Sequence, residues 1–380
     1  MKIALFLGAG ASVPYGKPTT AQLRDKLINK YGNTEGEGYL QTILACPLFE
    51  DVEHILQNMK DLTLFQNKLG GKFLNWMGER NRLIIGTRNQ GNRQYTDFVN
   101  NLNDIKSTLE KDIFENYSWD KDESDNPASQ ILSQIFDLLK KQSENIVVFT
   151  TNYDRAIEEF CSGNDNNYFC VDGFKLHQDS GRFLWNDGDY SYANTINDKT
   201  KVFLYKIHGS LNWKKHKNYG IERTTYERKP DDPNYEEDFL IYPTLSPKEE
   251  ANGRKPYNEI LKNFDDSMKD IDVCIIIGFS FRDDHVNEKF EEFVDRGGIL
   301  IAISPNSQYD FRTRVMKHEP TPEEKEKWDK STFSRLTGTG DGVGSKNSVN
   351  WNIKSLQKKL ETGTVKKLIQ EIEPILSEPA

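Results

Sequence analysis

The sequence predicts an α/β protein built on a mostly parallel β-sheet with helices on both faces. Short apolar runs alternate with segments of helical period through most of the chain. Several of these runs stop at glycine or at a cluster of polar side chains, where a strand would turn into a helix. Alternating strands and helices are typical of parallel sheets with crossover helices. The length of 380 residues, 36% of them hydrophobic, is enough for two to three domains with a sizeable core.

The individual elements follow from hydrophobic periodicity and from their flanking residues. A helix is expected to begin at Thr19 or Thr20, because a threonine hydroxyl can cap it and Leu23, Leu27 and Tyr31 share one face. The other expected helices are Arg155–Phe160, Tyr257–Met268 and Val286–Asp295. The expected strands are Lys2–Leu7, Ile146–Phe149, Lys201–Ile207, Asp272–Ile277 and Gly298–Ile303.

Four further segments complete the expected organisation. Tyr39–Gln142 carries three apolar stripes at helical spacing, which are typical of helix faces that pack on a core. Gly163–Thr200 reads as an irregular loop or short hairpin, and the highly charged Lys214–Asp238 as an exposed excursion. The charged tail from Thr321 includes a predicted amphipathic helix near Val365–Ile372.

Composition excludes several function classes. The net charge of −9 argues against a surface built for nucleic acid, so no direct nucleic-acid contact is expected. No run approaches the roughly 18 apolar residues of a membrane span, and the first apolar run reads as a strand rather than a signal peptide. We therefore expect a cytoplasmic protein. The four cysteines are scattered without a CxxC pair, so neither a disulfide nor a bound metal is expected.

The first predicted strand ends in the glycine-rich turn LGAGASVPYG. Gly8 and Gly10 permit a tight turn and a close approach to a ligand, and Ala11 and Ser12 would open a helix whose free N–H groups favour phosphate. The turn lacks the third glycine of a GxGxxG fingerprint, because Val13 stands there, and it lacks the GK[ST] of a P-loop. A turn that binds nothing is the alternative.

The second strand runs into the polar cluster TTNYD, residues 150–154. In open α/β sheets, ligands bind beyond the carboxyl ends of the strands, which makes such a cluster a candidate site. In the alternative interpretation, Asp154 caps the following helix and the threonines satisfy backbone groups.

Three more strand ends carry candidate residues. His208 follows a strand and precedes a glycine, and histidine is the side chain best suited to proton transfer near neutral pH. Gly278 and Ser280 end the next strand and could admit a ribose or phosphate, while Ser304 and Asn306 suit ribose hydroxyls or an adenine edge. A structural histidine and ordinary polar loops are the alternatives.

Taken in order, GAGAS, TTNYD, HG, IGFSF and a strand ending in SPN resemble the motifs of the sirtuin fold family. The sequence is most similar to the SIR2-like proteins of bacterial anti-phage systems, in which TTNYD replaces the TQNxD of typical sirtuins. The resemblance implies a Rossmann-like, NAD-binding catalytic domain over residues 1–306, with a helical insertion at about 39–142. Residues 307–380 would form an extension that makes subunit contacts.

Two departures weaken a deacylase interpretation. Protein deacylases of this family carry a four-cysteine zinc ribbon between the HG and GTS motifs, whereas here Cys274 is the only cysteine between His208 and Gly278. The sequence GKPTTAQL stands where typical members have PDFR. The resemblance therefore favours an NAD hydrolase, without a metal, that depletes the infected cell of NAD in abortive infection.

The resemblance also implies roles for individual residues. Asn152 would orient water and the ribose, Asp154 would bind the nicotinamide carboxamide, and His208 would be the general base. The residues expected to bind the rest of NAD are Gly8, Ala9, Gly10, Ser12, Thr151, Gly278, Ser280, Ser304 and Asn306.

The alternatives are a protein deacylase or ADP-ribosyltransferase, and a module that senses NAD or ADP-ribose without turnover. A sensor needs no general base, so the pairing of Asn152 with His208 disfavours it. Because an unrestrained NAD hydrolase would poison its own cell, we expect a homo-oligomer that a second protein activates. The resemblance implies a HerA-like ATPase as that partner.

Overall fold

The computed structural model describes residues 2–31, 52, 55–56, 104–105, 107–118, 127–141, 143–163, 167–186, 190–195, 198–224, 234–240, 255–303, 310–315, 317, 319, 321–323 and 333–337. The chain divides into two compact units. The first consists of Met1–Pro18, Tyr117–Ile241 and Ser246–Ala380, and the second of Thr19–Asn116 and Tyr242–Leu245.

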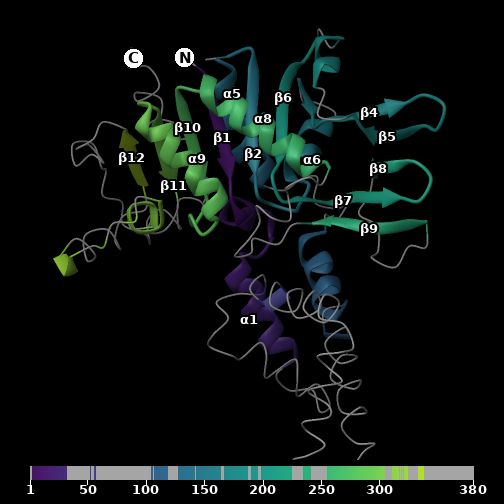
Figure 1. Cartoon of the computed structure of the whole chain (residues 1–380), viewed down its shortest axis with the longest axis horizontal. Coiled ribbons are helices and arrows are strands. Elements are labelled where there is room, and N and C mark those ends of the chain that lie inside the picture. Colours follow the sequence, from purple (N-terminus) through teal and green to yellow (C-terminus); the bar gives the residue numbers. More distant parts are fainter. Residues whose placement is uncertain are drawn as a thin grey trace, which may run out of the picture. The chain divides into compact units, whose positions relative to one another are not determined.

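The first unit is built on a seven-stranded sheet with the order β12-β11-β10-β1-β2-β6-β3 (Figure 1). All neighbouring strands are parallel except β11 and β12, which are antiparallel. The predicted α/β class with a mostly parallel sheet is therefore confirmed, and the five predicted strands all belong to this sheet. The strands are β1 (Ile3–Leu7), β2 (Asn145–Thr150), β3 (Tyr168–Val171), β6 (Thr200–Lys206), β10 (Val273–Ile277), β11 (Ile299–Ile303) and β12 (Phe333–Thr337).

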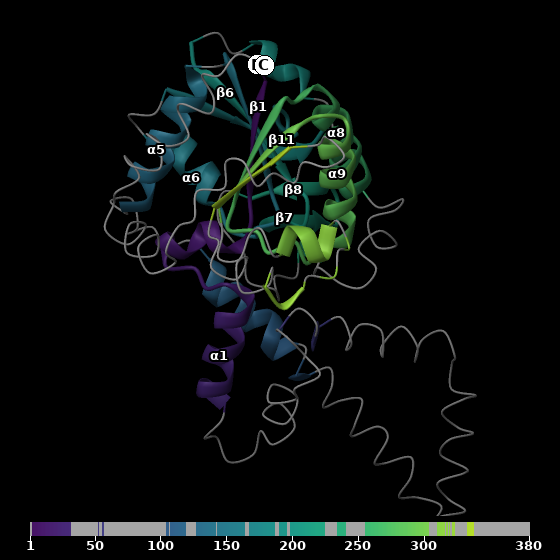
Figure 2. The same cartoon turned by 90° about the vertical axis from the view of Figure 1, so that its left-hand side faces the viewer.

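Helices cover both faces of this sheet, as Figure 2 shows for α5 and α6 on one side and α8 and α9 on the other. Strand β1 illustrates why: Leu5 packs into the core under α5 and α6, whereas its neighbour Phe6 packs under α8 and α9. Successive side chains of a strand point to opposite faces, so an unbroken apolar run fits a sheet that is covered twice. The helices are α5 (Pro127–Lys140), α6 (Ala156–Ser162), α8 (Tyr257–Asp270) and α9 (Asp284–Asp295).

The chain leaves β1 and β10 toward opposite faces of the sheet. After β1 it forms the short 3₁₀ helix η1 (Ala9–Tyr15), whose Tyr15 belongs to the core under α5 and α6. After β10 it forms α9, which packs on the other face. Since β1 and β10 are neighbours, their carboxyl ends mark a topological switch point, where ligands bind in open α/β sheets.

A second sheet is antiparallel, with the order β4-β5-β8-β7-β9. Its strands correct the prediction of an exposed excursion at Lys214–Asp238 in part: residues 217–220 are exposed, residues 225–233 lie outside the described residues, and Lys214 is buried. Lys214 is 2% exposed within β7, because a lysine stem can be buried along a strand and local charge does not establish exposure. The predicted hairpin within Gly163–Thr200 is present as the antiparallel strands β4 and β5, in which Phe174 pairs with Trp185. The strands are β4 (Phe174–His177), β5 (Arg182–Trp185), β7 (Gly209–His216), β8 (Gly220–Arg223) and β9 (Tyr235–Leu240).

In the second unit, α1 (Thr20–Tyr31) begins with a reciprocal cap. The Thr19 hydroxyl accepts the N–H of Gln22 at 3.2 Å, and the Gln22 side chain accepts the N–H of Thr19 at 2.9 Å. Asp112 accepts hydrogen bonds from Lys30 at 2.5 Å and from the Tyr31 hydroxyl at 2.7 Å. Residues of the predicted helical stripes are buried, namely Leu23, Leu27, Tyr31, Val52, Ile55, Leu56, Ile105, Leu109 and Ile113.

The structure places two segments differently from the predicted domain limits. Helix α5, predicted within the insertion at 39–142, belongs to the first unit and packs beside β2 on the sheet. Beyond residue 306, the turn η4 (Phe311–Val315) packs into the core under α8 and α9, and β12 extends the sheet. The predicted tail helix near 365–372 lies outside the described residues. Within the described ranges, no helix has the length and apolar character needed to cross a membrane.

Candidate functional site

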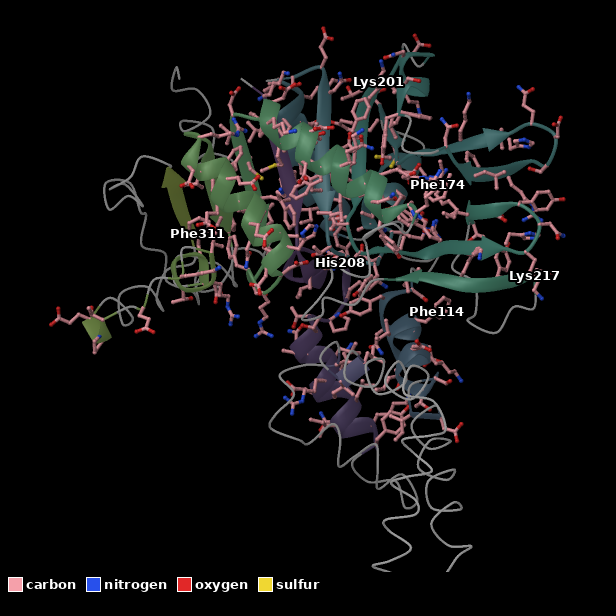
Figure 3. The ribbon with its side chains drawn as sticks, in the orientation of Figure 1. Phe114, Phe174, Lys201, His208, Lys217 and Phe311 are labelled. Carbon is pink, nitrogen blue, oxygen red and sulfur yellow. The ribbon has the colours of Figure 1, made fainter. Side chains whose placement is uncertain are left out.

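The candidate residues gather at the carboxyl edge of the parallel sheet. Strands β10, β1, β2 and β6 are neighbours in this order, and each is followed by a motif that the sequence singled out. Figure 3 shows the direction of β6, with Lys201 near its start and His208 just beyond its other end. The parallel arrangement therefore brings the four motifs to one edge of the sheet.

The glycine turns after β1 and β10 pack backbone against backbone. The N–H of Gly10 donates to the carbonyl of Gly278 at 2.9 Å. A Cβ on Gly10 would lie 2.8 Å from the Gly278 Cα, and one on Gly278, whose φ is +68°, would lie 2.3 Å from the Ala11 nitrogen. Both positions require glycine for this contact alone.

The N–H groups of the first turn already have partners in the protein. Those of Gly8, Gly10 and Ala11 donate to the carbonyls of Ile277, Gly278 and Gly8, each at 2.9 Å. The turn that the sequence offered as a diphosphate cradle thus joins two strand ends. Diphosphate binding by Gly8, Ala9 and Gly10 stays a prediction.

Asn152 connects the first two motifs. Its Nδ2 donates to the carbonyl of Gly8 and to the hydroxyl of Ser12, both at 2.9 Å. The Ser12 hydroxyl in turn donates to Asp154 Oδ2 at 2.5 Å. Ser12 and Asp154 are buried, and Asn152 is half-buried. We call Ser12, Asn152 and Asp154 the Asn152 group.

The structural roles offered as alternatives are also present. The Thr150 hydroxyl donates to the carbonyl of Leu7 at 2.9 Å and accepts the N–H of Asn152 at 3.0 Å. Asp154 Oδ1 accepts the N–H of Ala156 at 3.0 Å, at the start of α6. Asp154 therefore supports the helix with one oxygen and binds Ser12 with the other. Thr151, half-buried, follows β2 directly.

Tyr15 adds a neutral hydroxyl beside Asp154. Burial raises the pKa of Tyr15 above its ordinary value, and the negative charge of Asp154 raises it further. The hydroxyl is therefore protonated at any physiological pH. It is a residue of this region that the sequence interpretation did not include.

Lys206 supports the site from the last residue of β6, and the sequence interpretation missed it. The side chain is 1% exposed and its Nζ donates to Glu158 at 3.0 Å, to the Ser210 hydroxyl at 2.7 Å and to the backbone carbonyl of Asp154. A buried charge needs such partners, because desolvation is otherwise too costly. Lys206 thus fastens the segment after β2, at Asp154 and Glu158, to the end of β6.

His208 lies where the chain passes from the parallel sheet to the antiparallel one. Gly209, with φ of +84°, permits the reversal from β6 into β7. The His208 Nε2 lies 2.6 Å from Asp283 Oδ2, and both residues are 4% exposed. The sequence interpretation named His208 but not Asp283.

Asp283 also caps α9. Its Oδ1 accepts the N–H groups of His285 at 3.1 Å and Val286 at 3.3 Å. Burial raises the pKa of Asp283, but the hydrogen bond and charge of His208, with the N–H of Val286, outweigh burial and hold that pKa below its ordinary value. Asp283 is therefore ionised at neutral pH.

The loop between β10 and α9 holds the other predicted residues of this region. Gly278 contacts the first turn as described, and Ser280 is exposed. Phe281 is fully buried with φ of +54°, and its carbonyl accepts from Asn287 Nδ2 at 2.8 Å. The predicted Ser304 and Asn306 lie outside the described residues.

The Asn152 group and the His208–Asp283 pair have neighbours in different parts of the core. The Asn152 group adjoins Tyr15 and Ala156, which pack under α5 and α6. Asp283 adjoins Phe281 and Val286, which pack under α8 and α9. Among the described residues, no group of three or more His, Cys, Asp or Glu is placed to hold a metal ion.

Comparison with known proteins finds one matching family model. Residues 146–334 match the family model described as the SIR2-like domain. Over these residues the chain is similar to the SIR2-like domain. The matched segment includes Asn152, Asp154, His208 and Asp283, while the glycine turn after β1 precedes it.

Solved Sir2 homologues are also similar to the chain. One, a complex with NAD, has 14% sequence identity and a TM-score of 0.38, over 97% of this chain and 90% of that one. Another, a variant in complex with ADP-ribose, has 13% identity and a TM-score of 0.39, over 97% and 93%. No match was found among curated proteins.

Proposed function

We propose that the protein is an NAD glycohydrolase that cleaves NAD into nicotinamide and ADP-ribose. The observation that carries the proposal is the Asn152 group, fixed at the same sheet edge as His208 in a chain similar to the SIR2-like domain. The reaction needs little covalent assistance, because nicotinamide leaves as a neutral molecule and the transition state resembles an oxocarbenium ion. The protein has to hold NAD and present a water molecule to the anomeric carbon.

Asn152 would orient this water and the ribose. Both Nδ2 hydrogens of its amide are engaged, by Gly8 and by Ser12. The carbonyl Oδ1 is then the part of the side chain that can accept a hydrogen bond from water or from a ribose hydroxyl. A side chain fixed in this way is already oriented before the substrate binds.

Asp154 would accept a hydrogen bond from the nicotinamide carboxamide. Each carboxylate oxygen can accept two hydrogen bonds, so Asp154 retains capacity beyond Ser12 and Ala156. Residues of the two glycine turns would bind the rest of the molecule. They are Gly8, Ala9, Gly10 and Ser12 for the diphosphate, and Gly278 and Ser280 for the adenosine-side ribose and phosphate. Thr151, which follows β2, would also contact NAD.

His208 would be the general base, acting on water directly or through a ribose hydroxyl. A base is typically worth about 10²–10⁴-fold in rate. Its position beyond β6 places it at the same edge as the Asn152 group, since Thr150 and Lys206 are register partners in β2 and β6.

In the cell, this activity would deplete NAD as an effector of anti-phage defence. The order of the five motifs supports this proposal through their resemblance to bacterial SIR2-like defence proteins. The same resemblance supports a homo-oligomer in the cytoplasm that is weakly active alone and is activated by a HerA-like ATPase. Light scattering on the pure protein tests the first part, and NAD turnover with the ATPase added tests the second.

The activity is tested by incubating the full chain with NAD and separating the products by chromatography. Parallel samples contain an acyl-lysine peptide or the HerA-like ATPase. We expect nicotinamide and ADP-ribose in equal amounts, independent of the peptide. Nicotinamide that is released only with the peptide would show a deacylase, and NAD that stays intact in every sample would refute the proposal.

A further inference from the structure

We propose that Asp283 is a positioning residue that holds His208 in the tautomer with its proton on Nε2, so that Nδ1 is the atom that removes a proton. The proposal rests on the proposed NAD cleavage for its reaction. The tautomer itself is a property of the resting protein and can be measured without turnover.

The hydrogen bond between the two side chains decides which ring nitrogen carries the proton. An ionised carboxylate only accepts hydrogen bonds, so the Nε2 that lies 2.6 Å from Asp283 Oδ2 must be the donor. In a neutral imidazole the other nitrogen, Nδ1, then has the free electron pair. Both side chains are buried, so water does not compete for this hydrogen bond.

The two oxygens of Asp283 have separate tasks. Oδ1 accepts the first N–H groups of α9, from His285 and Val286, and Oδ2 is left for His208. Helix α9 is anchored in turn by Val286 and Phe290, which are fully buried. The orientation of the imidazole is therefore set by a packed helix, although His208 itself lies between two strands.

The same helix also fixes the loop that leads to Asp283. Phe281 has a positive φ, which is a strained conformation for a bulky residue and persists only where its surroundings enforce it. Asn287, one turn into α9, donates to the Phe281 carbonyl. Gly278, at the start of the loop, is held by Gly10. The loop is thus fixed at both ends, which limits the movement of Asp283.

The proposed step balances as a hydrolysis. The water oxygen forms a bond to the anomeric carbon while the glycosidic C–N bond breaks, and the electron pair of that bond neutralises the nicotinamide ring. The water proton moves to His208 Nδ1 and later to solvent. Asp283 stays ionised and stabilises the imidazolium that forms in between.

Asp283→Asn tests the assignment with little change in shape. If the amide oxygen continues to cap α9, the amide NH₂ faces His208, Nε2 must accept, and the ring proton moves to Nδ1. In serine proteases the equivalent change leaves the geometry intact and lowers kcat about 10⁴-fold. We expect kcat for nicotinamide release to fall about 10²–10⁴-fold, with KM for NAD changed by no more than a few-fold.

Asp284→Asn is the matched control. Asp284 is the next residue, lies in the first turn of α9 and is exposed. Its substitution removes the same charge, so kcat is expected to stay within about two-fold of wild type. Asp283→Ser is the second test variant, because serine is a good helix cap but offers His208 no carboxylate. It should lose as much kcat as Asp283→Asn.

The readout that a merely structural role would not change is the tautomer, measured by ¹⁵N NMR on protein labelled at its six histidines. Comparison with His208→Ala assigns the signal. Wild type and Asp284→Asn should show the proton on Nε2, and Asp283→Asn should show it on Nδ1. A wild-type proton on Nδ1 would overturn the proposal, as would a loss of kcat in Asp283→Asn with an unchanged tautomer.

The result separates this proposal from the proposed function. If wild-type protein cleaves NAD and Asp283→Asn cleaves it equally well, the positioning role fails while the glycohydrolase stands. If wild-type protein leaves NAD intact, the glycohydrolase fails, and the tautomers of the wild-type and Asp283→Asn proteins still decide what Asp283 does.

Discussion

The Asn152 group and the His208–Asp283 pair lie at the same sheet edge but are built differently. In the Asn152 group, side chains that follow the neighbouring strands β1 and β2 bond to one another directly. The His208–Asp283 pair joins β6 to the loop after β10, two strands that are separated in the sheet by β1 and β2. Side chains that follow adjacent strands can therefore contact one another directly. His208, which follows a more distant strand, instead bonds to Asp283, the residue that caps α9.

The two groups also differ in what holds them. The Asn152 group rests on neutral donors and on the carbonyl of Gly8. Beneath it, the charge of Lys206 is shared by Glu158 and the Asp154 carbonyl. The His208–Asp283 pair is itself the charged element and rests on the backbone of α9. Removing a single side chain should therefore have different consequences in the two groups.

Lys206→Met should have the largest effect on stability. It leaves Glu158 buried without its cationic partner, and breaking a buried ion pair typically costs about 3–5 kcal/mol. Urea unfolding measures the loss. Lys201→Met, at the half-buried start of the same strand, is the control and should cost less than about 1 kcal/mol. Equal losses in both variants would show that Lys206 does not support the Asn152 group in this way.

Gly278→Ala should break the contact between the two glycine turns. The new methyl group would lie 2.3 Å from the Ala11 nitrogen, in addition to the strain of a positive φ. We expect a loss of about 2–4 kcal/mol in the free energy of unfolding. Gly181→Ala shares the backbone conformation, with φ of +66°, but has open space around it, so it should lose only about 1 kcal/mol. If the two variants unfold alike, close packing at Gly278 is not what requires the glycine.

Ser12→Ala should cause a smaller loss in the free energy of unfolding than Gly278→Ala. It removes the donor to Asp154 Oδ2 and one acceptor for Asn152, and a buried polar group that loses its partner costs about 1–3 kcal/mol. The exposed Ser162, whose hydroxyl donates to the Glu159 carbonyl, is the control. Thermal unfolding of both alanine variants compares the two losses, and a larger loss at Ser162 would contradict the account.

The smallest expected effect is the change with pH in what the His208–Asp283 pair contributes to the free energy of unfolding. The pKa of Asp283 is below its ordinary value of about 3.9. Its pairing therefore contributes stability that is present above about pH 4 and is lost as the pH falls through the lowered pKa. The stability difference between wild type and Asp283→Asn, from urea unfolding, should shrink as the pH falls below 4. A difference that grows in acid would contradict the sign of the shift.

Much of the fold could be predicted from local pattern. The runs around Ile3–Leu7 and Val273–Ile277 are apolar on both faces, which a doubly covered parallel strand requires. The burial of Lys214 and Glu222, within the predicted excursion Lys214–Asp238, was missed because charge within a strand does not reveal whether the strand is buried. Strand β12 was not predicted, since its sequence FSRLT has neither a clear alternation nor an apolar run.

The candidate site also contains residues that could be predicted from local sequence and one contact that could not. Asn152, Asp154 and Ser12 could be predicted because each belongs to a motif at a strand end, and the structure brings them together. Asp283 has a local signal as a helix cap, three residues before the predicted start at Val286. Its bond to His208, 75 positions earlier, depends on the order of strands in the sheet and cannot be read from spacing.

The proposed NAD cleavage is tested most directly by the rate of nicotinamide release by Asn152→Ala and His208→Ala beside wild-type protein, with ADP-ribose binding measured in parallel. We expect each variant to lose at least about 10²-fold in rate, the minimum expected of a catalytic base, while it remains folded and still binds ADP-ribose. Retention of more than about a tenth of the wild-type rate by either variant would contradict the proposal.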